Sequence, residues 1–302
     1  MDKPTDRRWW HSAYLLLTIT TLGWGGNAIA GRLAAGTVPP MTLTAVRWVL
    51  TAIIFYMISR PMLPAAMPVL RARWRYLFIL GAAGFAGFNM VLYLALNFTT
   101  AINATILQSG MPMMIMLGMV IVFGERAHPL QIVGAIIAIL GVLYVASGGD
   151  PHRLVTLDLN VGDAIMLIAL LLYAGYSVGL KTKPSLPWQV QMFALTLGAA
   201  IASIPPFMVE FALGYRIDMG WPALAIMAYT VLIPSVVSQT FFVRAVELIG
   251  AGRAGLFINL VPVFGAGLAV LILGERFHLF HGIGLALVIT GIALSEFVAR
   301  RA

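Results

Sequence analysis

Residues 101–146 read AINATILQSGMPMMIMLGMVIVFGERAHPLQIVGAIIAILGVLYVA, and residues 251–296 read AGRAGLFINLVPVFGAGLAVLILGERFHLFHGIGLALVITGIALSE. The two apolar stretches align without a gap, about 150 residues apart. A duplicated membrane unit of this kind is typical of transporters built from two halves around a central site. The aligned identities are Ala101/Ala251, Ala104/Ala254, Pro112/Pro262, Gly124-Glu125-Arg126/Gly274-Glu275-Arg276, His128/His278, Gly134/Gly284 and Gly141/Gly291.

The composition of the whole chain also indicates a membrane protein. Hydrophobic residues make up 61% and charged residues 10%, whereas soluble domains carry about 25% charged residues. The net charge of +8 does not indicate a nucleic-acid partner, because the Lys and Arg residues lie between apolar runs rather than on one face. The absence of cysteine excludes a disulfide framework and Cys-based metal sites.

Apolar stretches of bilayer-spanning length occur throughout the chain. About 20 apolar residues span a bilayer as a helix, and the uncharged run 76–124 is far too long for one span. We therefore expect an all-α integral membrane protein with ten transmembrane helices. The predicted spans are 11–32, 41–60, 76–96, 101–123, 129–148, 161–180, 188–211, 221–243, 251–273 and 279–298.

The distribution of basic residues predicts the orientation of these spans. With ten spans, fourteen Lys and Arg residues fall in one set of alternate loops and the termini, and four fall in the other. Because cytoplasmic loops are enriched in Lys and Arg, both termini are expected in the cytoplasm. Five spans per half then make the second half, residues 150–302, inverted relative to the first, residues 1–149, within one integrated membrane domain. The first set is Lys3, Arg7, Arg8, Arg60, Arg71, Arg73, Arg75, Arg126, Lys181, Lys183, Arg244, Arg253, Arg300 and Arg301, and the second is Arg32, Arg153, Arg216 and Arg276.

The N-terminus allows a second interpretation. Basic residues, the apolar stretch 13–22 and Ala28-Ile29-Ala30 together resemble a cleavable secretory signal. However, Trp24-Gly25-Gly26-Asn27 has a counterpart at the same place in the second half, Tyr173-Ala174-Gly175-Tyr176. Cleavage would remove an element that the repeat retains, so a first transmembrane helix is favoured.

Several of these motifs resemble those of a known family. The string 251–256, residues 259–263 and Gly274-Glu275-Arg276 look like the second EamA repeat of the drug/metabolite transporter superfamily. Further similar motifs are Trp24-Gly25-Gly26-Asn27, Arg47, Gly162-Asp163 and Gly124-Glu125-Arg126. The resemblance implies two inverted five-helix repeats that export small metabolites, most often amino acids, by alternating access. It also implies a bacterial cytoplasmic (inner) membrane, and overall similarity points to YddG-type amino-acid exporters.

Polar side chains near the helix midpoints are candidates for a substrate site, because such groups are costly in lipid unless they face a partner or a cavity. The repeat register pairs Asn89 with Gln239 and Ser109 with Asn259. Interhelical packing by hydrogen bonds is the alternative role. The predicted substrate-binding residues are Trp24, Asn27, Asn89, Tyr93, Ser109, Tyr173, Tyr176, Ser238, Gln239 and Asn259.

Aromatic residues at similar depth, including Phe85, Phe88 and Phe242, suit an uncharged or zwitterionic, partly apolar solute. This favours aromatic and hydrophobic amino acids, although an aromatic stripe is also typical of ordinary packing.

Charged residues inside the spans are scarce. The acids Asp163, Glu210 and Glu296 fall near helix ends, which disfavours an antiporter with a mid-membrane carboxylate and leaves the coupling ion open. Arg47 lies inside the second span, about 10 Å from its outer end. It can bind a substrate carboxylate or extend to the outer interface, and we favour the second, structural role.

Pro112 and Pro262 lie at matching positions in the fourth and ninth spans. Each removes a backbone hydrogen bond and can kink its helix. We expect them to act as hinges during alternating access.

No enzyme class is indicated, because the sequence lacks a Walker loop, a dinucleotide fingerprint and a metal-spaced cluster of His and acidic residues. No catalytic residue, cofactor or metal is therefore expected. The expected partners are a small-molecule substrate and the lipid bilayer, and the oligomeric state stays open. The remaining alternatives are a transporter of another metabolite or drug, in either direction, and a channel or scaffold without alternating access.

Overall fold

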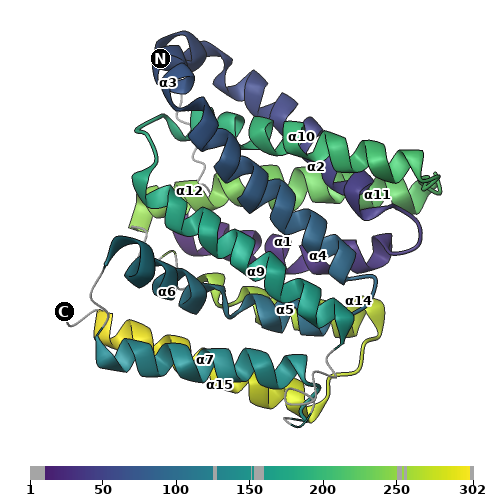
Figure 1. Ribbon diagram of the computed structural model, residues 1–302, viewed down its shortest axis with the longest axis vertical. Coiled ribbons are helices and arrows are strands. Elements are labelled where there is room, and N and C mark those ends of the chain that lie inside the picture. Colours follow the sequence, from purple (N-terminus) through teal and green to yellow (C-terminus); the bar gives the residue numbers. More distant parts are fainter. Residues whose placement is uncertain are drawn as a thin grey trace.

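A computed structural model describes residues 11–124, 128–150, 152, 160–249, 254 and 257–299. All regular secondary structure in these residues is helical (Figure 1), which confirms the all-α prediction. Two π-helical segments, η3 and η5, interrupt the α-helices. The helices are α1 (Ala13–Ala34), α2 (Pro40–Ser59), α3 (Leu63–Gly81), η3 (Ala82–Gly87), α4 (Phe88–Ala95), α5 (Ala101–Gln108), α6 (Met111–Phe123), α7 (Pro129–Ala146), α9 (Val161–Gly179), α10 (Trp188–Ala212), α11 (Trp221–Thr230), η5 (Val231–Val237), α12 (Ser238–Ile249), α14 (Val261–Leu273) and α15 (Leu279–Ala299), with short 3-10 turns η2 (Arg60–Met62) and η4 (Leu180–Thr182).

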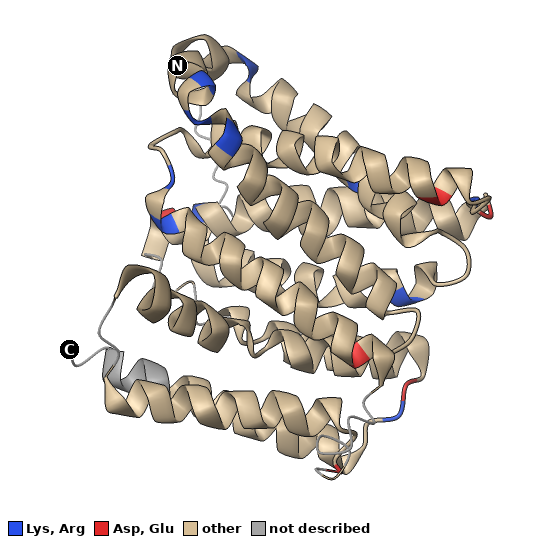
Figure 2. Cartoon of the chain, in the orientation of Figure 1, with Lys and Arg blue, Asp and Glu red and all other residues tan. Residues whose placement is uncertain are grey.

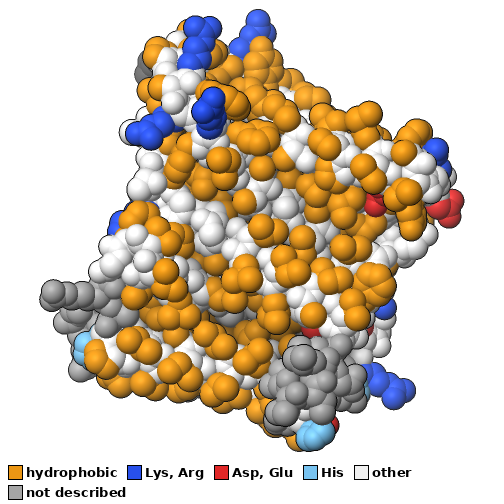
Figure 3. All heavy atoms as spheres, in the orientation of Figure 1, with side chains coloured by type: hydrophobic (Ala, Val, Ile, Leu, Met, Phe, Trp, Pro, Cys, Tyr) orange, Lys and Arg blue, Asp and Glu red, His pale blue; other side chains and the backbone are white. Residues whose placement is uncertain are grey.

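The helices have the length and surface of membrane spans. In the part of the chain that the structure describes, six continuous helical runs are long and apolar enough to cross a bilayer. Apolar side chains cover most of the visible face (Figure 3), and Lys and Arg lie mainly near the helix ends (Figure 2). The chain is therefore a multi-pass membrane protein. The six runs are Pro40–Ala95, Ala101–Phe123, Pro129–Ala146, Val161–Thr182, Trp188–Ala212 and Trp221–Ile249, and shorter apolar helices are Val261–Leu273 and Leu279–Leu294.

These criteria alone do not reproduce the predicted count of ten spans. Pro40–Ala95, at 56 residues, holds two of the predicted spans, and α1 is not among the apolar runs. Fourteen of the 22 residues of α1 are buried. Because α1 packs against protein rather than lipid over much of its surface, it tolerates more polar and small residues than a lipid-facing helix does.

Helices from the two halves pack in pairs that the repeat relates. The pairs α2 with α10 and α7 with α15 each bring together the matching helices of the two halves, and α5 packs on α14, whose counterpart in the first half is α6. Non-matching helices also pack across the halves in equivalent pairs. α1 packs on α12, and their counterparts in the repeat, α9 and α4, also pack together. Figure 1 shows α7 beside α15 at one side of the bundle and α2 beside α10 at the other.

The shared glycines of α7 and α15 explain how closely this pair packs. A Cβ atom added to Gly141 would lie 2.8 Å from the carbonyl oxygen of Gly284, and one added to Gly291 would lie 2.3 Å from that of Gly134. The two contacts are equivalent, because the repeat aligns Gly141 with Gly291 and Gly284 with Gly134. Only glycine lets the two backbones approach this closely.

The Gly-Glu-Arg motif has a structural role at the end of a helix. Gly124 and Gly274 end α6 and α14 in the left-handed conformation, with φ of 65° and 66°, which glycine adopts without steric cost. The carboxylate of Glu275 then accepts hydrogen bonds from the backbone N–H groups of Ala101 and Ile102, each at 2.9 Å. The second half thereby caps the first turn of α5. Glu125 and Arg126 of the first copy lie outside the described residues.

The predicted fourth and ninth spans, 101–123 and 251–273, are interrupted near the predicted kinks. Ser109 and Gly110 form a turn between α5 and α6, and the turn residues Asn259 and Leu260 precede α14. Pro112 and Pro262 lie in the first turns of α6 and α14, where a missing N–H leaves no helical hydrogen bond unmade. The predicted fourth span is therefore two helices in sequence, α5 and α6, rather than one bent helix.

Some sequence predictions concern residues without a described structure. Of the basic residues used for the orientation, Lys3, Arg7, Arg8, Arg126, Arg153, Arg253, Arg300 and Arg301 lie outside the described ranges.

Candidate functional site

A cavity of about 520 Å³ lies between the two halves. Its volume is in the range of small-molecule sites. Its walls come from α1, α2, η3, α4 and the α5–α6 break in the first half, and from α9, η5, α12 and the start of α14 in the second. The sequence-predicted residues that line it are Trp24, Asn27, Asn89, Ser109, Tyr173, Gln239 and Asn259, together with the predicted hinges Pro112 and Pro262.

Three predicted substrate-binding residues lie behind the cavity wall. Tyr93 is 1% exposed and its hydroxyl donates a hydrogen bond to Oδ1 of Asn27 at 2.8 Å. Tyr176 is buried with its ring 5.5 Å from that of Tyr173. Ser238 is also buried, and its hydroxyl has no hydrogen-bond partner among the described residues. These residues contact the lining rather than form it.

The π-helical segments provide backbone acceptors beside the cavity. A π turn leaves carbonyl groups outside the regular α-helical hydrogen-bond pattern. In η3, the carbonyl of Phe85 accepts from Nε1 of Trp48 at 3.2 Å and from Nδ2 of Asn89 at 2.8 Å. In η5, the carbonyl of Pro234 accepts from Nε1 of Trp24 at 3.1 Å. These hydrogen bonds fix the indole rings and one amide at the cavity wall.

The amides of the site differ in their hydrogen bonding. Both side-chain atoms of Asn89 are engaged, since Oδ1 accepts from Arg47 and Nδ2 donates to Phe85. Gln239 and Asn259 also line the cavity, and within the described ranges neither side chain makes a hydrogen bond. These two amides are therefore available to a solute.

Aromatic rings form the apolar part of the lining. Trp48 and Phe85 stack with their ring centroids 4.8 Å apart, and Phe88 lies 5.2 Å from Tyr173. All four residues line the cavity. Such rings bury apolar surface and present the negative faces of their π systems.

The structure places Arg47 differently from the sequence prediction. Its side chain is 5% exposed and lines the cavity, with Nη1 2.7 Å from Oδ1 of both Asn27 and Asn89. The prediction that it extends to the outer interface is therefore wrong, because two amide oxygens hold the guanidinium inside the bundle. Gln108 is a second lining residue that was missed, although a Gln inside an uncharged run is a visible signal.

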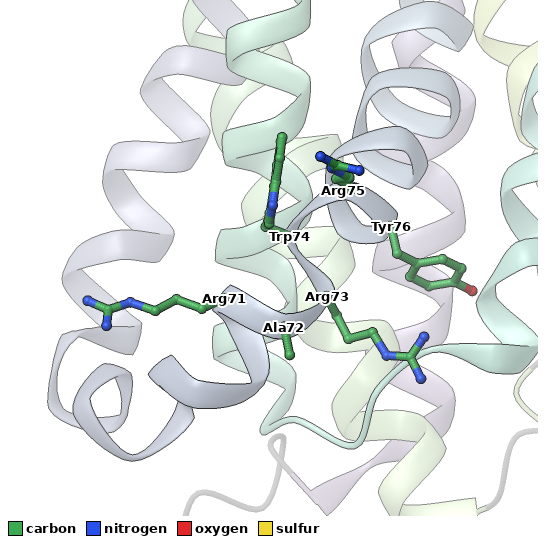
Figure 4. Close-up of a pocket in the computed structure, with 6 residues that line it drawn as sticks. All are labelled: Arg71, Ala72, Arg73, Trp74, Arg75 and Tyr76. Carbon is green, nitrogen blue, oxygen red and sulfur yellow. The ribbon is translucent and has the colours of Figure 1, made fainter.

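A second hollow of about 420 Å³ has a different character. It is lined by six consecutive residues, 71–76, at the point where Arg73 departs from helical geometry within α3. Figure 4 shows the side chain of Arg71 extending to one side and those of Arg73 and Tyr76 extending to the other, rather than all toward one centre. Trp74 is 58% exposed. Exposed Trp and Arg residues are typical of a membrane–water interface. Because its side chains do not converge on one point, this hollow differs from a solute site.

Acidic residues are used elsewhere in the described chain. Glu210 accepts hydrogen bonds from the backbone N–H groups of Met41 and Thr42, at 3.2 and 2.7 Å. Asp163 accepts from Thr99 and Asn103. Among the described residues, no three His, Asp or Glu side chains come together as a metal site.

Comparison with known proteins places this arrangement in context. The chain is 25% identical over 301 residues to a probable amino-acid metabolite efflux pump of Escherichia coli (strain K12), covering 95% of each chain. It is 27% identical over 226 residues to the uncharacterized transporter YyaM of Bacillus subtilis (strain 168), covering 74% of this chain and 73% of that one. A crystal structure with a TM-score of 0.66 and 20% identity covers 96% of this chain and 99% of the other, which shows a shared fold.

The family comparison covers both halves. The EamA-like transporter family matches residues 11–147 and again residues 160–297. The two matches together span most of the chain, in agreement with the duplicated motifs and the paired helices. The chain belongs to the EamA-like transporter family.

Proposed function

We propose that this chain is a secondary transporter that exports small metabolites, with aromatic and other hydrophobic amino acids as the favoured substrates. The observation that carries the proposal is the cavity between the halves. Its lining combines aromatic rings with the amides of Gln239 and Asn259, which make no side-chain hydrogen bond within the described residues. Such a lining suits a solute with one polar end and one apolar end. The name of the Escherichia coli relative, a probable amino-acid metabolite efflux pump, supports the same class.

Alternating access is the mechanism that we propose. The cavity lies where both halves are interrupted, at η3 and η5 and at the breaks before α6 and α14. Helix interruptions near the middle of a membrane are typical of transporters whose two repeats move around a fixed site. The matched positions of Pro112 and Pro262 support paired hinges, one for each gate.

For the topology, we propose ten spans in two inverted five-helix repeats, residues 1–149 and 150–302. The first residues of α1 and the last residues of α15 lie at the same end of the bundle (Figure 1), and Lys and Arg gather toward that end (Figure 2). This supports cytoplasmic termini in a bacterial inner membrane.

Counterflow in proteoliposomes tests the transport function. Vesicles loaded with unlabelled L-phenylalanine, L-leucine or L-methionine are diluted into a trace of the same labelled compound, with and without a pH gradient. A carrier should accumulate label transiently, and protein-free vesicles should not. The absence of accumulation for every compound, together with sustained ion current, would support the alternative of a channel.

Reporter fusions test the topology separately. Fusions at Ala302 and within residues 60–75 should report the cytoplasm, and a fusion within residues 148–160 should report the opposite side. Termini on different sides would contradict an even number of spans.

A further inference from the structure

Arg47 brings a positive charge into the interior of the bundle. Its Nε donates a hydrogen bond to Oγ of Ser235 at 2.8 Å. Nη1 lies 2.7 Å from Oδ1 of Asn27 and 2.7 Å from Oδ1 of Asn89, and it also donates to the hydroxyl of Tyr93. Three of the partners lie in the first half of the chain, on α1 and α4, and Ser235 lies in the second half, on η5. The guanidinium is therefore held in one orientation.

All four of these partners are neutral. Amide and hydroxyl oxygens orient a guanidinium but do not cancel its charge, and a buried charge without a counterion is strongly unfavourable. Three described carboxylates accept hydrogen bonds from groups other than Arg47. Glu210 accepts from Thr42, Asp163 from Asn103 and Glu275 from Ala101. Within the described ranges, no carboxylate forms an ion pair or a hydrogen bond with Arg47.

The guanidinium also retains unused donors. An Arg side chain has five N–H groups in a planar fork, and the hydrogen bonds above use those of Nε and Nη1. In the described part of the chain, Nη2 makes no hydrogen bond, and Arg47 lines the cavity. The ring of Trp48 lies on one side of the guanidinium, 4.8 Å from its central carbon. The remaining donors are thus available to a group inside the cavity.

We propose that Arg47 binds the carboxylate group of the transported solute. The inference rests on the proposed function, since it assumes that the solute occupies this cavity. A single carboxylate neutralises the single charge and matches the planar geometry of the guanidinium. Arg47 is the only charged residue among the described residues that line the cavity, so a dianionic phosphate would leave a net negative charge in a medium of low dielectric constant.

The same geometry places the remainder of the solute. The rings of Phe85, Phe88 and Tyr173 lie on the cavity wall and accept an apolar side chain. A zwitterion's ammonium group has no acidic partner among the described lining residues, and it is received by the amide oxygens of Gln239 and Asn259 and by aromatic faces. The carboxylate is therefore the group that contributes most to recognition.

A ligand series on the wild-type protein tests this assignment without any mutation. Binding is measured by isothermal titration of the purified full chain in lipid nanodiscs. Each of L-phenylalanine, L-leucine and L-methionine is compared with its decarboxylated amine, namely phenethylamine, isoamylamine and 3-methylthiopropylamine. We expect loss of the carboxylate to weaken binding by a factor of about ten or more. If no acid binds more tightly than its amine, including the case in which none of the acids binds, the assignment is overturned.

Two variants and a matched control test the role of the residue itself. Arg47→Gln should bring each acid and its amine within about threefold of one another, and Arg47→Lys should restore part of the preference because it keeps the charge. Arg32→Gln is the control, because Arg32 binds the carbonyl of Leu96 and does not line the cavity. Size-exclusion chromatography reports whether each variant folds. A folded Arg47→Gln variant that keeps the full preference for acids would overturn the assignment.

Counterflow separates the two proposals. If the acids bind through Arg47 but no counterflow occurs, the carboxylate site stands and the carrier function fails. If the amines bind and undergo counterflow as well as the acids do, the carrier function stands and the carboxylate site fails.

Discussion

The two halves of the chain contain the same interrupted helix and use it differently. The segment α3–η3–α4 in the first half corresponds to α11–η5–α12 in the second, and Asn89 and Gln239 are each the second residue after the π segment. Asn89 accepts a hydrogen bond from Arg47, whereas Gln239 lines the cavity without a described side-chain hydrogen bond. Duplication has preserved the depth of the amide in the bundle. Its contacts have diverged, from orienting the charge of Arg47 in one half to facing the cavity in the other.

The largest expected effect comes from removing the two amides in turn. Asn89→Leu takes an acceptor from Arg47 and a donor from the carbonyl of Phe85, so we expect a loss of about 1–3 kcal/mol in stability and loss of transport. Gln239→Leu removes no described hydrogen bond, so stability should change by about 0.5 kcal/mol or less while transport falls. Thermal unfolding in detergent and counterflow rates measure the two effects. Equal destabilisation by both variants would show that the amides share one role.

The π segments provide a second way to sharpen the comparison. A Cβ atom at Gly84 in η3 would lie 2.1 Å from Cγ of Tyr176, so Gly84→Ala should destabilise the protein by about 1–3 kcal/mol as the ring is displaced. At the matching position in η5, Pro234→Ala adds no atom against the core and should cost less than about 1 kcal/mol. Thermal unfolding of both variants tests this order. A larger loss in Pro234→Ala would mean that proline, rather than packing, maintains the π geometry.

The two prolines should affect rate more than stability. Pro112→Ala and Pro262→Ala restore an N–H group that allows the preceding helix to continue, and a carrier needs its two end states close in free energy. We expect folded protein, slowed counterflow and a shift in access to the cavity, in opposite directions for the two variants. Because the chain has no cysteine, Ile115→Cys at the cavity wall reports access through labelling by an impermeant maleimide. Unchanged turnover in both variants would falsify the hinge assignment.

The smallest effect is expected at Ser109, the counterpart of Asn259. Its hydroxyl already donates to the carbonyl of Ile106 in the last turn of α5, so Ser109→Ala should leave the counterflow rate within about twofold. Asn259→Ala removes an amide that faces the cavity and should slow counterflow more. A larger effect at Ser109 would indicate that its hydroxyl contacts the solute.

Local sequence signals predicted the all-helical fold and several residues of the cavity lining. Apolar length is a property of consecutive residues, and a polar residue such as Gln239 is conspicuous in an apolar run. The direction of Arg47 could not be predicted in the same way, because its long side chain reaches either the interface or the interior, and partners on α1, α4 and η5 decide between them. The π segments and the exclusion of Tyr176 from the cavity likewise depend on tertiary packing.

The cap on α5 has a consequence for how the protein is made. The first N–H groups of a helix carry partial positive charge and need acceptors, and those of Ala101 and Ile102 find theirs in Glu275, which is 174 residues after Ala101 in the chain. During synthesis, α5 is thus complete long before its cap exists. The first half cannot reach its final hydrogen bonding on its own, and this cap forms only when the segment that follows α14 lies beside α5.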